Sequence, residues 1–143
     1  MIFSDGITDS ARNASSWKGA STFSHDAHNI VVVGADDHDM ARAVRRLTEI
    51  GGGEVVVEDG GVRAELGLPV AGLLSEAPLK EVVTASRGCI QAAARLGCTL
   101  ASPFQMLAFL ALSVIPSLKI TDRGLVDVDR FELVPLASDP RSA

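Results

Sequence analysis

The sequence predicts an α+β domain with a mixed, largely antiparallel sheet packed by about three helices. Short valine-rich segments lie between turn residues, and longer segments repeat apolar residues at helical spacing. The dipeptide Asp59-Gly60 adds a strong signal for a tight antiparallel hairpin, because that turn requires positive φ. The expected order is β-α-β-β-α-α-β-β, in which a hairpin and a terminal meander argue against a doubly wound parallel sheet. The length of 143 residues suits one domain.

The first expected strand is Ile30 to Val33, which is apolar throughout, so both of its faces should be covered. Asp36 is a plausible N-cap for the following helix, which continues at helical spacing to Ile50. The run Gly51-Gly52-Gly53 should end that helix, since glycine tolerates the left-handed conformation after a helix. Strands are then expected over residues 54–58 and 62–66, with a turn between them and Pro69 beyond.

The second half should hold two helices and a meander. Ser75 can cap a helix from about Glu76 to Leu96, in which Gly88 costs about 1 kcal/mol relative to alanine. Ser102-Pro103 opens another helix, apolar nearly all round, which should therefore sit centrally. The last strands, expected over 118–120, 125–128 and 131–136, should complete the sheet. One apolar stripe is expected along the first of these helices: Leu79, Val82, Val83, Ser86, Cys89, Ile90, Ala93 and Leu96.

Three parts of the chain are distinguished. Residues 1–20 should form a loosely ordered N-terminal arm, which Trp17 can anchor to the body. Residues 21–136 should form the α+β domain, and residues 137–143 a tail.

Composition restricts the class of partner. The net charge of −5 argues against a nucleic-acid surface, which needs clustered Lys and Arg. The most apolar window, Phe104 to Leu112, is shorter than the roughly 20 residues that span a bilayer, so no membrane is expected. No signal peptide is visible after Met1. Cys89 and Cys98 would lie on opposite faces of one helix, which favours unpaired thiols and a reducing, cytoplasmic compartment.

Functional groups are densest in the polar loop before the first strand, where His25, Asp26, His28 and Asn29 follow closely. In an extended segment Asp26 and His28 share a face, and such a pair can move a proton or orient a ligand. Both histidines and an acid could also bind a metal, although three or four ligands at a recognised spacing are missing. Alternatively these side chains only hold the loop to the backbone, a role that suits Asn29.

Other sequence patterns give weaker indications of a functional site. The segment from Val31 to Asp37 looks like a dinucleotide turn but lacks the G-x-G-x-x-G fingerprint, and acids stand where a phosphate would bind. The three glycines at 51–53 have no following Lys-Ser or Lys-Thr, as a P-loop requires. Asp122, Asp127 and Asp129 could gather around a cation, but they fit turns and a solvated strand face equally well.

The loop and first strand also carry a resemblance to a known family. His25-Asp26-Ala27-His28-Asn29-Ile30-Val31-Val32-Val33-Gly34 is similar to the H-D-S-H-N-I-x-x-V-G segment that opens the C-terminal domain of bacterial adenine deaminases, with Ala27 in place of the usual Ser. The similarity runs in order from about Ala20 to Leu136. Further matching blocks are Asp36–Ala41, Gly51–Gly53, Leu68–Ser75, Leu96–Cys98, Pro103–Phe104, Phe109–Leu112, Val114–Pro116 and Leu118–Asp127.

This resemblance implies part of a purine-salvage hydrolase of the amidohydrolase superfamily. Such enzymes convert adenine to hypoxanthine and ammonia with a metal-bound hydroxide, and their metal ligands belong to a preceding (β/α)-barrel. A barrel needs roughly 200 residues or more, so it does not fit in this chain. No cofactor is therefore expected here, and a divalent metal (Mn, Fe or Zn) would belong to the missing barrel.

Three hypotheses follow. In the first, the domain is not catalytic alone, and the loop with His25, Asp26, His28 and Asn29 meets the barrel, where it shapes the purine pocket or secures the contact. In the second, the chain is a binding or assembly module that forms a homodimer or complements a separate barrel chain, through an unusually apolar surface. In the third, it is a free-standing enzyme with His25, Asp26 and His28 as candidate catalytic residues in a closed pocket.

Overall fold

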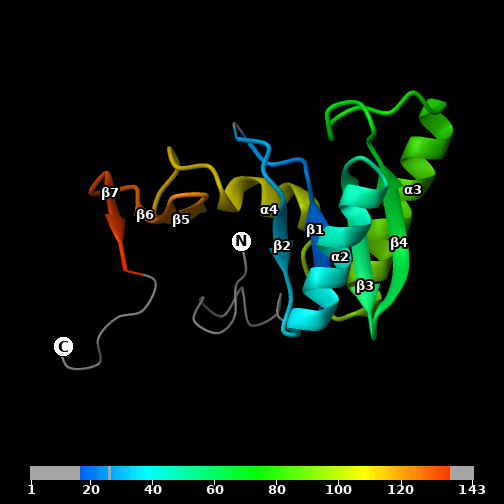
Figure 1. The fold of residues 1–143 in the computed structure, drawn as a ribbon, viewed down its shortest axis with the longest axis horizontal. Helices are drawn as coiled ribbons and strands as arrows, with labels where there is room; N and C mark the ends of the chain where they lie inside the picture. The colour runs from blue at the N-terminus through cyan, green and yellow to red at the C-terminus, as the bar shows by residue number, and fades with distance from the viewer. Residues whose placement is uncertain (1–16, 26, 136–143) are drawn as a thin grey trace.

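A computed structural model describes residues 17–25 and 27–135 of the chain (Figure 1). These residues form three helices and two antiparallel sheets, which confirms the α+β class. In chain order the elements are β1 (Lys18–Ser21), β2 (Val31–Val33), α2 (Asp37–Glu49), β3 (Gly53–Glu58), β4 (Gly61–Gly67), α3 (Leu79–Arg95), α4 (Pro103–Leu110), β5 (Leu118–Thr121), β6 (Gly124–Asp127) and β7 (Glu132–Val134).

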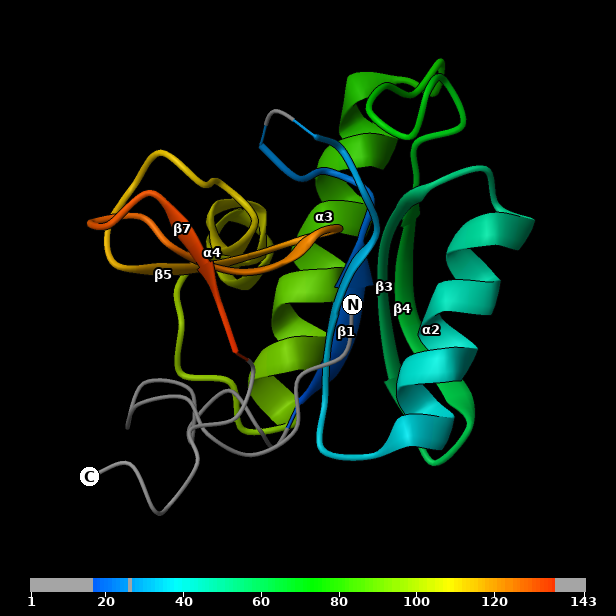
Figure 2. The same ribbon diagram turned by 60° about the vertical axis from the view of Figure 1, so that its left-hand side comes forward.

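The larger sheet has the strand order β2-β1-β3-β4 and carries a helical layer on each face. Figure 2 shows α2 on one face and α3 with α4 on the other. Alternation along a strand sends neighbouring side chains into different cores. Val31 packs in the core under α3 and α4, and Val32 packs in the core under α2. The expectation that both faces of this strand are covered is therefore confirmed.

The central strand β1 was not predicted from the sequence. It pairs with β2 on one side and β3 on the other, although Lys18-Gly19-Ala20-Ser21 has no apolar period. A side chain at Gly19 would overlap the Trp17 ring, so glycine at this position leaves room for the indole. Trp17 is buried and meets Phe104 edge-on at 5.4 Å, while its role as an anchor for the N-terminal arm stays a prediction. The division at residues 20 and 137 stays a prediction, because residues 1–16 and 136–143 lie outside the described structure.

Local signals predicted α2 and the following hairpin well. A carboxylate oxygen of Asp36 accepts a hydrogen bond from the backbone N–H of Asp39 at 2.8 Å, as an N-cap should. The three glycines after the helix all have positive φ, and so do Asp59 and Gly60 in the turn between β3 and β4. These positions need the left-handed region, which explains their residue types.

The second half of the chain differs from expectation in four ways. Helix α3 begins at Leu79 rather than near Glu76, because the Ser75 hydroxyl accepts from the Ala77 N–H in a local turn and Pro78 takes the cap position. Two residues of its apolar stripe, Leu79 and Val83, are exposed, with Leu79 at 78%, although Val82 packs against the core. Helix α4 is not central, since Met106 is half-exposed. The last strands form a separate sheet, β5-β6-β7, instead of completing the first. None of the described helices is long and apolar enough to cross a membrane.

Candidate functional site

The histidine loop between β1 and β2 is a tight turn. The backbone N–H of His28 donates to the carbonyl of Ser24 at 3.0 Å, and the N–H of Ala27 donates to that of His25 at 2.9 Å. An extended segment, in which Asp26 and His28 would share a face, is therefore wrong for this stretch. Asp26 itself lies outside the described residues, so its pairing with either histidine stays a prediction.

Helix α4 anchors this loop through His25. The His25 N–H donates to the carbonyl of Ala108 at 3.1 Å, and the imidazole stacks on the Phe109 ring with 5.5 Å between centroids and 14° between planes. Phe109 belongs to the short, apolar helix α4, which Pro103 starts. The exposed His25 ring thus stacks on Phe109 beside the four-stranded sheet.

His28 and Asn29 complete the loop and lead into β2. His28 adopts a positive φ of 47°, an uncommon conformation for a residue other than glycine, and its ring lies 6.0 Å from that of Phe23. Both side chains are exposed, and within the described residues neither makes a hydrogen bond. Backbone hydrogen bonds therefore hold the turn, and these two side chains are available to a ligand or a partner surface.

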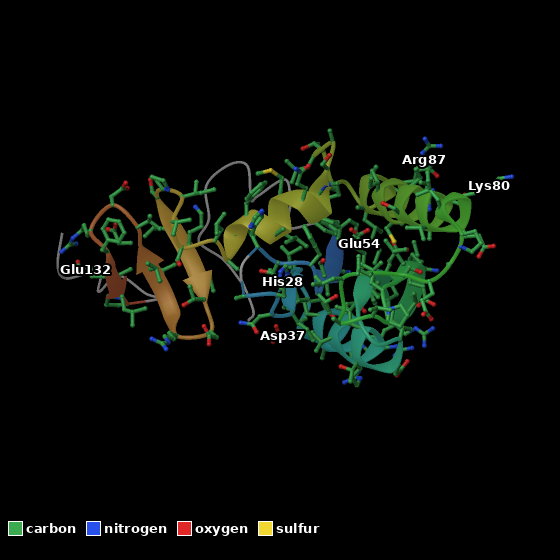
Figure 3. All side chains as sticks on the ribbon, turned by 90° about the horizontal axis from the view of Figure 1, so that it is seen from above. His28, Asp37, Glu54, Lys80, Arg87 and Glu132 are labelled. Carbon is green, nitrogen blue, oxygen red and sulfur yellow. The ribbon has the colours of Figure 1, made fainter. Side chains whose placement is uncertain are left out.

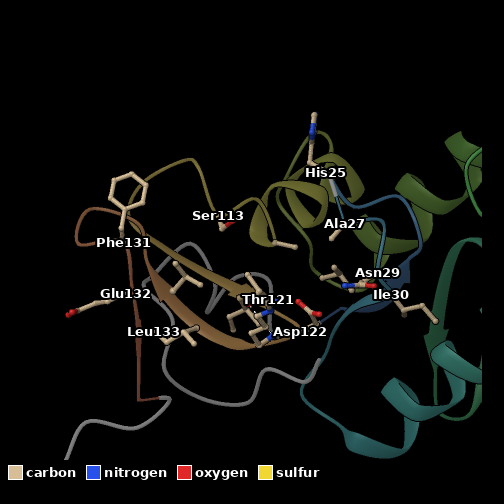
Figure 4. A pocket seen from close by; sticks show the side chains of 15 residues that line it. His25, Ala27, Asn29, Ile30, Ser113, Thr121, Asp122, Phe131, Glu132 and Leu133 are labelled. Carbon is tan, nitrogen blue, oxygen red and sulfur yellow. Dashed lines mark hydrogen bonds between the residues drawn. The ribbon is translucent and has the colours of Figure 1, made fainter.

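An open groove of about 540 Å³ runs between this loop and the C-terminal sheet (Figure 4). One wall comes from the loop and β2, and the other comes from β5, β6, β7 and the turn before β7. The side chains at its edges are exposed, whereas a free-standing enzyme at His25 and His28 would require a closed pocket. Its lining includes His25, Asn29, Asp122, Phe131, Glu132 and Leu133.

A second group of polar side chains lies at the start of α2. Donor atoms of Asp36, His38 and Asp39 lie within 4.8 Å of one another, the kind of grouping that can hold a cation. Both Asp39 oxygens, however, are already occupied: one accepts from the Gly60 N–H at 2.6 Å, and the other accepts from the Asp59 N–H and the Lys18 ammonium at 3.0 Å each. Asp39 thus fastens the β3–β4 turn and β1 to α2.

The electrostatics of Asp39 support this structural role. Burial raises the pKa of its carboxyl, but the Gly60 N–H, the Lys18 ammonium and the Asp59 N–H together outweigh that effect. The pKa of Asp39 therefore lies below its ordinary value, and the carboxylate is stabilised as an anion by protein groups. Neither this cluster nor the described part of the histidine loop supplies three free ligands with an open position, as a catalytic divalent metal needs. The described residues do not fit such a centre.

Glu54 is a half-buried glutamate in β3, within the segment that the sequence predicted as a valine-rich strand. It shares the sheet face of Val56 beneath α3 and α4, whereas Lys80, Arg87 and Glu132 project outward (Figure 3). Its Oε2 atom has no hydrogen-bond partner among the described residues. Burial raises the pKa of Glu54 to about 7. The same burial, with the nearby charges of Glu54 and Glu65, raises the pKa of the Cys89 thiol to about 12, so Cys89 is inert as a nucleophile at neutral pH.

Glu54→Gln is expected to stabilise the chain at pH 8 by about 1 to 3 kcal/mol, at about 1.4 kcal/mol per pKa unit. The folded-state pKa lies above the ordinary value, so the folded chain binds the extra proton between about pH 4.5 and pH 7. Stability of the parent chain should therefore fall as pH rises through that window, and the Gln variant should lose this dependence. Urea unfolding at pH 5 and pH 8 measures it.

Glu58→Gln, at the end of the same strand beside Arg63, is the control and should leave the pH dependence unchanged, because the Glu58 side chain is 37% exposed. Equal pH dependence in the parent chain and the Glu54 variant would contradict the assignment of a buried, neutral carboxyl.

Comparison with known proteins agrees with the similarity seen in the sequence. The family described as adenine deaminase C-terminal domain matches residues 13–132. The adenine deaminase of Brucella abortus (strain 2308) is 62% identical over 115 residues, which cover 80% of this chain and 20% of that protein. Those of Methylobacterium sp. (strain 4-46) and Oleidesulfovibrio alaskensis are 58% and 56% identical over 81% and 82% of this chain. The chain spans about a fifth of the length of these relatives.

Proposed function

The chain belongs to the adenine deaminase C-terminal domain family, and we propose that it serves an enzyme that hydrolyses adenine to hypoxanthine and ammonia. The observation that carries the proposal is the identity of 56–62% to proteins named adenine deaminase over about four-fifths of this chain. In this reaction water adds to the ring carbon that bears the amino group, and ammonia leaves. We further propose purine salvage in the cytoplasm as the setting, which the two free, buried cysteines favour.

The metal-binding part of the enzyme is proposed to lie outside this domain. The matched 115 residues are 20% of the Brucella protein, so about 460 residues lie outside the match. A metal-binding barrel needs roughly 200 residues or more, and so it fits there. A divalent metal (Mn, Fe or Zn) in that part would supply the activated water. The chain's own residues supply a surface beside it.

The histidine loop is proposed as the part of that surface nearest the purine. The flat His25 ring, backed by Phe109, suits stacking against a planar heterocycle. The exposed Asn29 amide can donate to and accept from the polar edge of such a ring. His28 and Asp26 are proposed to secure the contact with the rest of the enzyme. These roles orient the substrate and exclude water, while the bond-making step takes place outside this chain.

The purified chain alone is expected to show no adenine turnover with added Mn²⁺, Fe²⁺ or Zn²⁺. The physical reason is that its described side chains do not provide three free metal ligands. Ammonia release and metal content after dialysis measure this. Turnover with one tightly bound metal per chain would contradict the proposal and assign catalysis to residues of this chain.

His25→Ala is expected to lower kcat/KM for adenine at least tenfold in a chimera, in which residues 17–135 of this chain replace the matching segment of the Brucella abortus enzyme. The loss follows from removal of the stacked ring beside the proposed substrate site. His38→Ala is a matched control, because His38 is an exposed histidine on α2, away from the groove. Equal activity of the His25 variant, the His38 variant and the parent chimera would overturn the role of the loop.

The second candidate is an assembly module that forms a homodimer. The observation in its favour is the number of large apolar side chains left exposed, among them Leu74 at 64% and Leu79 at 78%. Surfaces of this kind mark interaction sites. Sedimentation of the chain over a concentration series tests it: a dimer that Leu79→Ser dissociates would support this candidate, and a monomer throughout would exclude it.

A further inference from the structure

The C-terminal sheet stands apart from both hydrophobic cores. Strands β5, β6 and β7 have three or four residues each and contribute no side chain to either core. Figure 1 shows them beyond the end of α4, away from the four-stranded sheet. Leu118 and Leu133, on opposite faces, are 53% and 59% exposed. Ile120 is buried at 7%, but the opposite face, which carries Leu133, has no buried side chain in these strands, and a small sheet normally needs packing against other structure to be stable.

Phe131 adds an independent observation. It has a positive φ of 52°, which is a true outlier for a bulky residue, and its side chain is 84% exposed. Strained backbone of this kind persists where surrounding structure enforces it, and it gathers at functional contacts. Here the strain holds an aromatic ring out into solvent at the rim of the groove (Figure 4). Exposed aromatic anchors of this type dominate the energetics of many interfaces.

We propose that the wall formed by Phe131 and Leu133, together with the facing loop at His25 and Asn29, is the surface on which the rest of the adenine deaminase docks. The occupant follows from the length of the relatives, of which four-fifths lie outside the matched segment. Its docking surface is apolar, with a pocket for the Phe131 ring. This inference rests on the proposed function, because it takes the partner to be the remainder of that enzyme.

The position of Phe131 and Leu133 at the groove means that one contact would both cover the C-terminal sheet and complete the proposed substrate site. A partner that covers Phe131 and Leu133 closes the open side of the groove, and so places its own surface opposite His25 and Asn29. Covering the sheet and completing the proposed substrate site are then one event. The exposed start of α3, with Leu79, lies at the other end of the molecule and stays free.

The test compares the isolated 143-residue chain with the Brucella chimera by amide hydrogen exchange. We expect exchange at residues 131–133 to be at least tenfold slower in the chimera. Phe131→Gly should remove this protection and lower adenine turnover at least fivefold. In the isolated chain the same variant should leave the thermal midpoint unchanged or higher, because glycine relieves the positive φ. Leu133→Ser should also reduce protection, while Leu79→Ser, at an equally exposed leucine, should not.

The outcomes of this test distinguish the proposed docking surface from the proposed function of the domain. Equal exchange in the isolated chain and an active chimera would overturn the docking surface and leave the proposed function intact. Protection in a chimera without turnover would support the docking surface and count against the catalytic proposal. A dimer of the isolated chain that Phe131→Gly dissociates would assign the surface to a second copy and overturn the inference. A fall in the thermal midpoint of the isolated Phe131→Gly chain would show a structural role instead.

Discussion

Asp39→Ala is expected to lower the free energy of unfolding by about 2 to 4 kcal/mol. The change removes a buried carboxylate that accepts from two backbone N–H groups and pairs with Lys18, so it leaves those donors without partners. The lysine is 19% exposed, which places the effect somewhat below that of a fully buried pair. Urea unfolding followed by fluorescence measures the loss, since Trp17 is the sole tryptophan and lies in the core.

Asp37→Ala is the matched control, because Asp37 is an exposed acid in the same helical turn and should change stability by about 0.5 kcal/mol or less. The pKa of Asp39 is lowered on folding, so its contribution should be present above about pH 4 and lost as pH falls further. Similar losses of unfolding free energy in the two variants would contradict the role of Asp39 in fastening β1 and the β3–β4 turn to α2. A Zn²⁺-dependent rise in the thermal midpoint that Asp39→Ala abolishes would assign a metal to the cluster instead.

Gly53→Ala is expected to destabilise the chain by about 3 to 5 kcal/mol. Gly53 has a φ of 133°, which side-chain-bearing residues rarely adopt, and a Cβ there would overlap the carbonyl oxygen of Leu66 on β4. The strand would have to move. That would break the 2.7 Å hydrogen bond from the Gly53 N–H to the Thr22 hydroxyl and the 3.0 Å bond from the Thr22 N–H to the Gly53 carbonyl. Chemical denaturation measures the loss.

Gly88→Ala, also a glycine-to-alanine change, is expected to raise the stability of the chain instead of lowering it. Gly88 lies within α3, and a Cβ at this position meets nothing within 4 Å. Alanine should therefore stabilise the chain by about 0.5 to 1 kcal/mol through its better helix propensity. Destabilisation of similar size in both variants would mean that general sensitivity to added volume, and not backbone conformation at Gly53, governs the result.

The sequence predicted elements whose signals are local. The cap at Asp36, the glycines after α2 and the turn at Asp59-Gly60 each depend on a few adjacent residues, and all three were confirmed. Strand β1 could not be found in this way, because its place in the sheet comes from pairing with β2 and with β3, over thirty residues away. The start of α3 was misplaced because serine can satisfy either a helix cap or a local turn.

The candidate site was only partly predicted, because its geometry also depends on contacts between residues far apart in the sequence. The sequence identified which side chains of the loop could carry function, but the contacts of His25 with Ala108 and Phe109 depend on α4, which lies far along the chain. Glu54 was missed because three consecutive valines give no alternation that assigns Glu54 to a face, and only the packing of α3 and α4 shows that its face is covered. Phe131 carried no local signal beyond its size.

The position of β1 has a practical consequence for cutting the protein into pieces. The first described strand is an inner strand of the sheet, so a fragment that begins after Ser21 would leave β2 and β3 without the strand that joins them. Unpaired strand edges and an uncovered Phe104 would then face solvent, which favours aggregation. An expression boundary or fusion junction should therefore fall before Trp17.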